Sequence, residues 1–152
     1  MDQNYLVIVN ESEESRVSLR FCAKRAVKTD RGVEVLAIVA PQEFVSWGGV
    51  QAALEEEEMH RIESAIAASV GEIVEASGIK PTITIKQGDP IKVIKEMIAE
   101  RDDLAALVLG AAPGHNPGPI VKHFTGEGAG DLPCPILLVP GGLSDERVEL
   151  LA

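Results

Sequence analysis

The chain has 152 residues, of which 45% are hydrophobic and 25% are charged, and its net charge is −10. That length and composition predict one globular domain over residues 1–152. The acidic balance excludes a nucleic-acid partner, which needs clustered Lys and Arg. No apolar run reaches the roughly 18 residues of a membrane helix. The N-terminus lacks the basic region of a signal peptide, so we expect a cytoplasmic protein without a membrane partner.

The first strand is expected at residues 5–9, "YLVIV", a continuous apolar run typical of a strand covered on both faces. The acidic and serine-rich residues that follow predict the start of a helix, with side chains that accept backbone N–H bonds. Apolar residues then recur at helical spacing, and basic residues, including the cluster at 20–28, take the opposite side. We interpret this basic side as a solvated face and Gly32 as the residue just after the helix.

The middle of the chain continues the alternation. Residues 33–40 predict a second strand, 41–49 a loop and 50–77 a long helix, with Gly78 just after its end. Residues 82–86, "TITIK", alternate polar and apolar side chains, which favours a strand near the edge of a sheet.

The last third of the chain begins with Asp89 as an expected N-cap and Pro90 in the first turn of a helix. The wholly apolar stretch at 104–110 predicts a central strand. Three further elements are expected: a short helix over about 118–127, a last strand at 133–140, and a final helical turn capped by Ser144. Five strands that alternate with about four helices predict an α/β fold, with a parallel sheet and helices on both faces.

Four segments together resemble the universal stress proteins. They are "YLVIVNESEES" (5–15), "GDPIKVIKEMIAE" (88–100), "LAALVLGAAPG" (104–114) and "PCPILLVP" (133–140), in the family's order. The resemblance implies an open, Rossmann-like parallel sheet of five strands in the order 3-2-1-4-5. It also implies a ligand crevice between the first and fourth strands, walled by Asn10 and Ser12 on one side and Gly110 with its loop on the other.

The resemblance also allows a test for ATP binding, because nucleotide-binding members carry glycine, two residues, glycine, nine residues, glycine, then serine or threonine. Gly110 fits the first glycine, but Pro113 stands where the second is required, and Gly114 comes one residue late. Counting nine intervening residues from Gly114 leads to Phe124 and not to glycine, and the Thr125-Gly126 pair that follows has the required residue types in reversed order. The pattern is therefore degenerate.

The prolines in this loop weaken it further as a phosphate site. Pro113, Pro117 and Pro119 have no N–H to offer a phosphate, and the glutamates near residues 11–14 add negative potential that Lys122 offsets only in part. Three interpretations remain open: a stiff structural connection, a nucleotide loop with altered spacing, or a site for another anionic or small ligand.

The leading hypothesis is a non-catalytic stress-response regulatory or binding domain without tight ATP binding and with no cofactor. No nucleophile–base pair, paired carboxylates or metal cluster supports an enzyme, and the two cysteines and three histidines have no ligand-like spacing. The alternative is an ATP-binding switch or slow ATPase that uses the loop at 110–126. If Mg-ATP binds, the contacts expected are the ribose at Asn10, the adenine at the backbone of Val39 or Ala40, and the phosphates at Gly110, Gly114 and Gly118.

Family members commonly form homodimers, so we expect one here, through the last strand at 135–139. Ile136 and Val139 or Leu137 would be partly buried by the second copy. A regulatory protein partner is also expected. Trp47, the only tryptophan, lies in the glycine-containing loop and is expected to act either as a hydrophobic plug or as a lid or partner contact.

Overall fold

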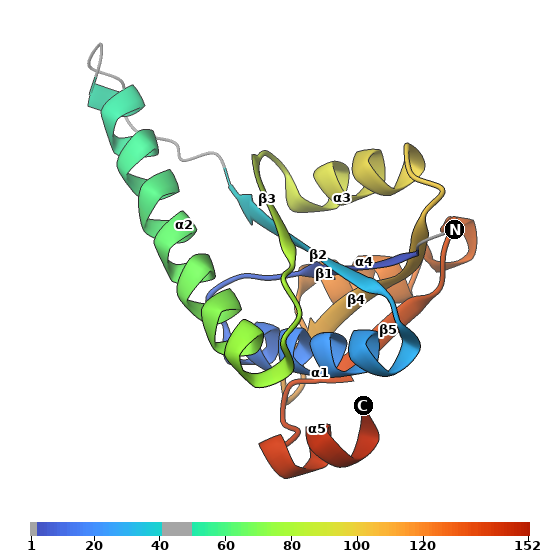
Figure 1. The fold of residues 1–152 in the computed structure, drawn as a ribbon. Coiled ribbons are helices and arrows are strands. Elements are labelled where there is room, and N and C mark those ends of the chain that lie inside the picture. Colours follow the sequence, from blue (N-terminus) through green and yellow to red (C-terminus); the bar gives the residue numbers. More distant parts are fainter. Residues whose placement is uncertain (1–2, 41–49) are drawn as a thin grey trace.

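Strands and helices alternate along the chain in the computed structural model, which describes residues 3–40 and 50–152 (Figure 1). The expectation about Trp47 lies outside the described residues. The elements are β1 (Asn4–Ile8), α1 (Glu13–Thr29), β2 (Gly32–Val39), α2 (Val50–Ser77), β3 (Thr82–Gln87), α3 (Pro90–Ala99), β4 (Leu104–Ala111), α4 (Pro119–Thr125), the 3-10 turn η1 (Ala129–Asp131), β5 (Ile136–Pro140) and α5 (Asp145–Leu151).

The five strands form one parallel sheet in the order β3-β2-β1-β4-β5. This confirms the α/β, Rossmann-like fold and the strand order expected from the sequence. The apolar strands β1 and β4 are neighbours at the centre, with Val7 opposite Val108. The alternating strand β3 lies at one edge, and β5 lies at the other.

Helices cover both faces of the sheet (Figure 1). On one face α1 and α2 pack against side chains such as Val7, and Ile66 of α2 is 1% exposed there. On the other face α3 and α4 pack against side chains such as Leu6, with Ile94 and Phe124 fully buried. Successive residues of β1 thus point into two separate cores, which is why the strand is apolar throughout.

The last strand is shorter than the sequence predicts. It begins at Ile136 and not at residue 133, because Pro133 and Pro135 have no N–H to donate to a neighbouring strand. The carbonyl of Pro135 does join the sheet, since it accepts a hydrogen bond of 2.9 Å from the N–H of Leu107. The helix expected over about 118–127 is likewise shorter and ends at Thr125.

The end of α1 also differs from the expectation. The residue with left-handed backbone is Asp30, with φ of 52°, and its N–H bonds back to the carbonyls of Ala26 and Val27. Gly32 is instead the first residue of β2. A Cβ there would lie 2.2 Å from Oδ1 of Asn4, so a larger residue would require the Asn4 side chain to move.

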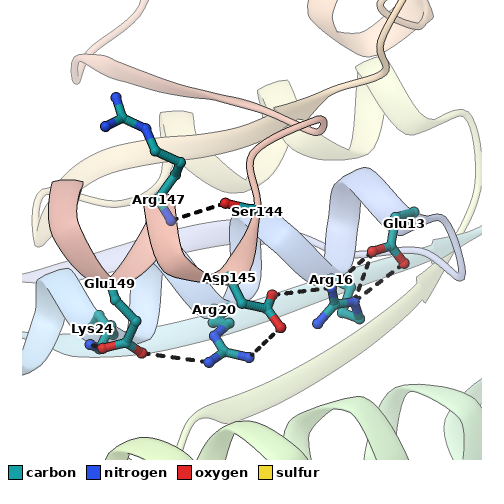
Figure 2. A network of polar contacts seen from close by, with 8 residues as sticks. All are labelled: Glu13, Arg16, Arg20, Lys24, Ser144, Asp145, Arg147 and Glu149. Atoms are coloured by element: carbon teal, nitrogen blue, oxygen red, sulfur yellow. Dashed lines mark hydrogen bonds and ion pairs between the residues drawn. The ribbon is translucent and has the colours of Figure 1, made fainter.

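The basic side of α1 is not a solvated face, because α5 lies along it (Figure 2). Asp145 accepts ion pairs of 3.3 Å from both Arg16 and Arg20. Glu149 pairs with Arg20 at 3.5 Å and with Lys24. The interpretation from the sequence is therefore wrong for these basic residues, whose partners lie more than a hundred positions further along the chain.

Candidate functional site

A cavity of about 380 Å³ opens beyond the carboxyl ends of the two central strands, β1 and β4. Its size falls in the range of about 300–1,000 Å³ common for small-molecule sites. Three helix starts surround it, those of α1, α3 and α4. The lining residues that the structure describes are Ile8, Asn10, Glu14, Ser15, Asp89, Pro90, Ile91, Leu109, Gly110, Pro117, Gly118, Pro119, Ile120 and Val121. The cavity therefore lies at the switch point of the sheet, where ligands of open α/β folds bind.

Asn10 lines this cavity, but its side-chain oxygen is already engaged. Oδ1 accepts hydrogen bonds from the N–H of Ser12 at 2.8 Å and from Oγ of Ser15 at 2.9 Å. In return, the N–H of Asn10 donates to Oγ of Ser15 at 3.0 Å. The amide nitrogen of Asn10 is the part of the side chain left to meet a ligand, so the predicted ribose contact would be a donated hydrogen bond.

Ser12 belongs to the helix start and does not line the cavity. Its Oγ accepts from the N–H of Ser15 at 3.2 Å and so caps α1. Ser12 lines a separate hollow of about 100 Å³ that includes Arg16 and Ser69. Asn10 lines both hollows, so the structure places Ser12 beside Asn10 but not, as expected, in the same cavity as Gly110.

Gly110 lines the cavity, and the packing of α1 explains why it is glycine. A Cβ at this position would lie 2.3 Å from the backbone oxygen of Glu14. Gly141, after β5, is constrained in the same way, since its Cβ would lie 2.5 Å from Cβ of Glu14. Both glycines allow the first turn of α1 to approach the ends of β4 and β5, a role that requires no nucleotide.

The loop after β4 uses two of its N–H groups in hydrogen bonds to its own residues. The N–H of Ala112 donates to the carbonyl of Pro117 at 3.3 Å, and the N–H of Gly118 donates to Oδ1 of Asn116 at 3.2 Å. Gly118, with φ of 107°, lines the cavity just before Pro119 begins α4. Gly114 has φ of 96° but is exposed and is not among the lining residues. The structure thus brings Gly118, and not Gly114, to Asn10 and Gly110.

The two residues expected at an adenine ring lie apart from this group. Val39 is 5% exposed, and its carbonyl accepts a hydrogen bond of 3.0 Å from the N–H of Gly88. Ala40 is exposed at the end of β2. Neither is among the described residues that line the cavity.

The start of α3 contributes residues that were not expected at the site. Asp89 caps this helix, since its Oδ2 accepts from the N–H of Lys92 at 3.1 Å, and Pro90 and Ile91 line the cavity beside it. The sequence did contain a signal for this placement. A helix that follows a parallel strand begins at the carboxyl edge of the sheet, so the N-cap at Asp89 indicates that the start of α3 lies at that edge. The cap was recognised from the sequence, but its position beside the switch point was not.

The charged groups around the cavity are acidic. Glu14 and Asp89 line it, and among the described lining residues there is no Lys, Arg or His. Lys122, expected to offset the acidic helix start, is exposed on α4 and is not part of the lining. These carboxylates oppose an anionic ligand, whereas the N-termini of α1, α3 and α4 favour one.

Three further observations concern metal ligands, a cysteine and the length of the helices. Within residues 3–40 and 50–152, no group of three or more His, Cys, Asp or Glu side chains is placed to hold a metal ion. Burial raises the pKa of the Cys22 thiol to about 12, so this cysteine does not form a thiolate near neutral pH. None of the described helices has the length and apolar character needed to span a membrane.

Comparison with known proteins gives a consistent result. The model of the universal stress protein family matches residues 1–140. No curated protein matches the chain. Among solved structures, UspA from Lactobacillus plantarum has a TM-score of 0.71 and 14% identity, with 90% of this chain and 97% of that chain covered.

Two other solved structures resemble the chain. A universal stress protein family member from Burkholderia pseudomallei has a TM-score of 0.70 and 12% identity, with coverage of 91% of this chain and 96% of that chain. A universal stress protein family protein from Arabidopsis thaliana, solved with AMP bound, has a TM-score of 0.57 and 15% identity, with 95% of this chain and 94% of that chain covered. At such identities the likeness shows the fold.

Proposed function

The chain belongs to the universal stress protein family, and on that premise we propose that it is a non-catalytic, cytoplasmic stress-response regulator that acts as a homodimer and does not bind ATP tightly. The observation that carries the proposal is the cavity at the ends of β1 and β4, which is lined by two carboxylates and by three prolines. Such a site suits a sensing role, in which a small ligand alters how the dimer meets a regulatory protein partner.

A binding role is favoured over catalysis by the chemistry of the lining residues. Ser15 is the one hydroxyl side chain among them, and its Oγ donates to Oδ1 of Asn10. The described lining residues include no histidine, cysteine or lysine that could activate it as a nucleophile. Ser15 is also only 5% exposed, so we assign it to the helix start.

We expect the affinity for ATP to be weaker than about 100 µM, or about 5.5 kcal/mol of binding free energy. A tight triphosphate site needs several convergent N–H groups and a compensating positive charge. Here the N–H groups of Ala112 and Gly118 are engaged within the loop, and the lining prolines Pro117 and Pro119 have none. Each missing charge-assisted hydrogen bond costs about 1.5–3 kcal/mol.

Titration calorimetry with ATP and Mg²⁺ tests this expectation. The variant Gly118→Val alters a lining residue with positive φ, whereas Gly130→Ala adds a methyl group into open space and is the control. A micromolar dissociation constant that Gly118→Val abolishes and Gly130→Ala preserves would show a working nucleotide loop and would overturn the proposal.

The alternative function is an ATP-binding switch or slow ATPase that uses the loop at 110–126, with Mg²⁺ screening the carboxylates. The AMP bound to the Arabidopsis thaliana neighbour favours it. The calorimetric titration separates the two functions, and an assay for phosphate release tests for turnover. Tight binding with slow release of phosphate would establish the alternative.

We expect the dimer to form through β5, the edge strand whose outer backbone groups have no strand partner within the described sheet. Leu138 of this strand is 42% exposed, while Ile136 and Leu137 are half-buried. Val139 is already only 1% exposed within one copy, so Leu138 offers more surface for a partner to bury.

Sedimentation at tens of micromolar protein tests the dimer. The variant Leu138→Asp should shift the protein toward the monomer, because it places a charge in the pairing strand. Leu150→Asp is the matched control, since Leu150 is 71% exposed on α5 and away from β5. A wild-type monomer, or equal dissociation of both variants, would contradict pairing through β5.

A further inference from the structure

The helix α5 lies alongside α1 and meets it with one side of its own surface (Figure 1). Asp145 and Glu149 form ion pairs with α1. Val148 is 0% exposed and Ala152 is 3% exposed. These four residues have the spacing i, i+3, i+4 and i+7, which places side chains on a single helix face. The same spacing is found where an amphipathic helix of one protein docks on another.

The matching surface of α1 is a row of basic residues one helical turn apart: Arg16, Arg20, Lys24 and Lys28. Asp145 pairs with the first two of them, and Glu149 pairs with the second and third (Figure 2). Nζ of the fourth donates a hydrogen bond to the backbone carbonyl of Ala152. The acidic groups of α5 therefore follow the cations of α1 in register, turn by turn.

Two of these cations depend on α5 for their carboxylate partners. Arg20 and Lys24 form ion pairs only with α5 among the residues that the structure describes, whereas Arg16 also pairs with Glu13 of its own helix at 2.9 Å. Without α5, the α1 surface would present unpaired cations beside the apolar position that Val148 fills. These are the two features that an acidic amphipathic helix recognises.

The sheet is complete without α5. The last strand, β5, ends at Pro140, and the family model matches residues 1–140. A helix of seven residues that is held by partly exposed ion pairs and one buried valine separates from the domain at a lower free-energy cost than a central strand does. The surface that α5 covers is therefore within reach of a competing helix.

We propose that the α1 surface covered by α5 is a docking site for an acidic amphipathic helix of the regulatory protein partner, and that this helix replaces α5 when it binds. The inference rests on the proposed function, which includes such a partner. The partner helix would carry carboxylates at i and i+4 and a small apolar side chain at i+3, as α5 does. Nucleic acid is disfavoured, because the row holds four cations in a chain of net charge −10.

A separate protein is favoured over the α5 of a second copy, because the segment before α5 is short. The N–H of Gly141 donates to the carbonyl of Ala111 at 2.8 Å, so the free connection begins after this glycine. The three residues 142–144 span at most about 10 Å. Exchange of α5 between copies would require the α1 helix of the second copy to lie within that distance.

A stapled, fluorescein-labelled peptide with the sequence of residues 143–152 is the probe. The staple joins the exposed positions Glu146 and Leu150, so the side that faces α1 is unchanged. Fluorescence anisotropy measures its binding to the full chain, and amide shifts of the ¹⁵N-labelled protein locate it. The wild type should bind weakly because α5 competes. Val148→Ala in the protein loosens α5 and should increase the affinity about tenfold, with shifts along α1.

Two charge reversals of equal size test whether the row on α1 is the site. In the Val148→Ala background, Lys24→Glu should weaken binding about tenfold or more, whereas Arg25→Glu, at an exposed neighbouring position, should leave it unchanged. A peptide that carries Glu149→Lys should bind the Lys24→Glu protein again but not the Arg25→Glu protein. Because the two proteins have the same net charge, general electrostatic attraction would not separate them.

No saturable binding to the Val148→Ala protein at up to about 1 mM peptide, or equal loss in Lys24→Glu and Arg25→Glu, would overturn the inference. A dimer that the peptide dissociates in sedimentation would assign the surface to a second copy and would also overturn it. The ATP titration tests the proposed function separately. Weak ATP binding without peptide binding overturns the inference alone, whereas micromolar ATP binding overturns the proposed function itself.

Discussion

At the scale of single residues, two different explanations apply to the glycine at position 110. In the sequence it fits the first glycine of a nucleotide loop, and in the structure it lines the cavity. The distance of 2.3 Å between a Cβ at this position and the backbone oxygen of Glu14 shows that α1 also requires it. A backbone carbonyl cannot move away as a flexible side chain would, so the requirement is steric.

We therefore expect Gly110→Ala to destabilise the protein by about 2–3 kcal/mol, in the range of overpacked cores. Gly71→Ala is the matched control, because Gly71 lies within α2 with no atom within 4 Å of an added Cβ. That substitution should stabilise the helix by about 0.5–1 kcal/mol. Urea unfolding of both variants measures the difference, and a Gly110→Ala variant as stable as the wild type would contradict the steric role.

At the scale of elements, α5 is a helix of seven residues that could not persist alone in water. Val148 anchors it in the core with 0% exposure, and Asp145 and Glu149 pair with the basic side of α1 (Figure 2). The family model ends at residue 140, so α5 lies beyond the matched part of the chain.

We expect the core anchor to contribute more to stability than the ion pairs. The double variant Asp145→Asn, Glu149→Gln should lower the free energy of unfolding by about 1 kcal/mol or less, since partly exposed pairs contribute little, and the loss should shrink at high salt. Val148→Ala should cost about 2 kcal/mol at any salt concentration. Thermal unfolding at two salt concentrations tests this, with the exposed Glu146→Gln as control. A larger, salt-dependent loss in the double variant than in Val148→Ala would reverse the ranking.

At the scale of the whole molecule, a second polar cluster ties the sheet together at the end opposite the cavity. Arg101 pairs with Glu34 of β2 at 2.7 Å and with Asp103, just before β4, at 2.6 Å. Asn4 of β1 donates to Asp103 at 3.2 Å. The hydrogen bond from Arg101 holds the pKa of Asp103 at about 2, below its ordinary value of 3.8.

The sign of this shift predicts an acid-sensitive contribution to stability. Because the pKa of Asp103 is lower in the folded state, its stabilisation is present above about pH 4 and is lost as the pH falls toward 2. The wild type should therefore have a higher melting temperature than Asp103→Asn near neutral pH, and the difference should shrink between about pH 4 and pH 2. Asp102→Asn, at an exposed neighbouring position, is the control. A difference between wild type and Asp103→Asn that is independent of pH would refute the role of the ionised carboxylate.

The sequence predicts the positions of the strands and helices better than it predicts which residues line the cavity. The central strands are apolar throughout because both faces are covered, so their positions followed from the residues alone. The ion pairs between Arg20 and α5 could not be found this way, because they join residues far apart in the chain. Gly114 was misplaced for a different, local reason: the conformation of the loop, with its hydrogen bond from Ala112 to Pro117 and the positive φ of Gly118, brings Gly118 to the cavity.

The strand order has a consequence for biosynthesis. In the centre of the sheet Asn4 pairs with Leu104 and Val7 with Val108. Most of the chain must therefore be synthesised after β1 before its second neighbour, β4, leaves the ribosome. Until then, the nascent chain can pair β1 only with β2, and an apolar strand edge stays exposed. Late pairing of this kind slows folding and favours misassembly.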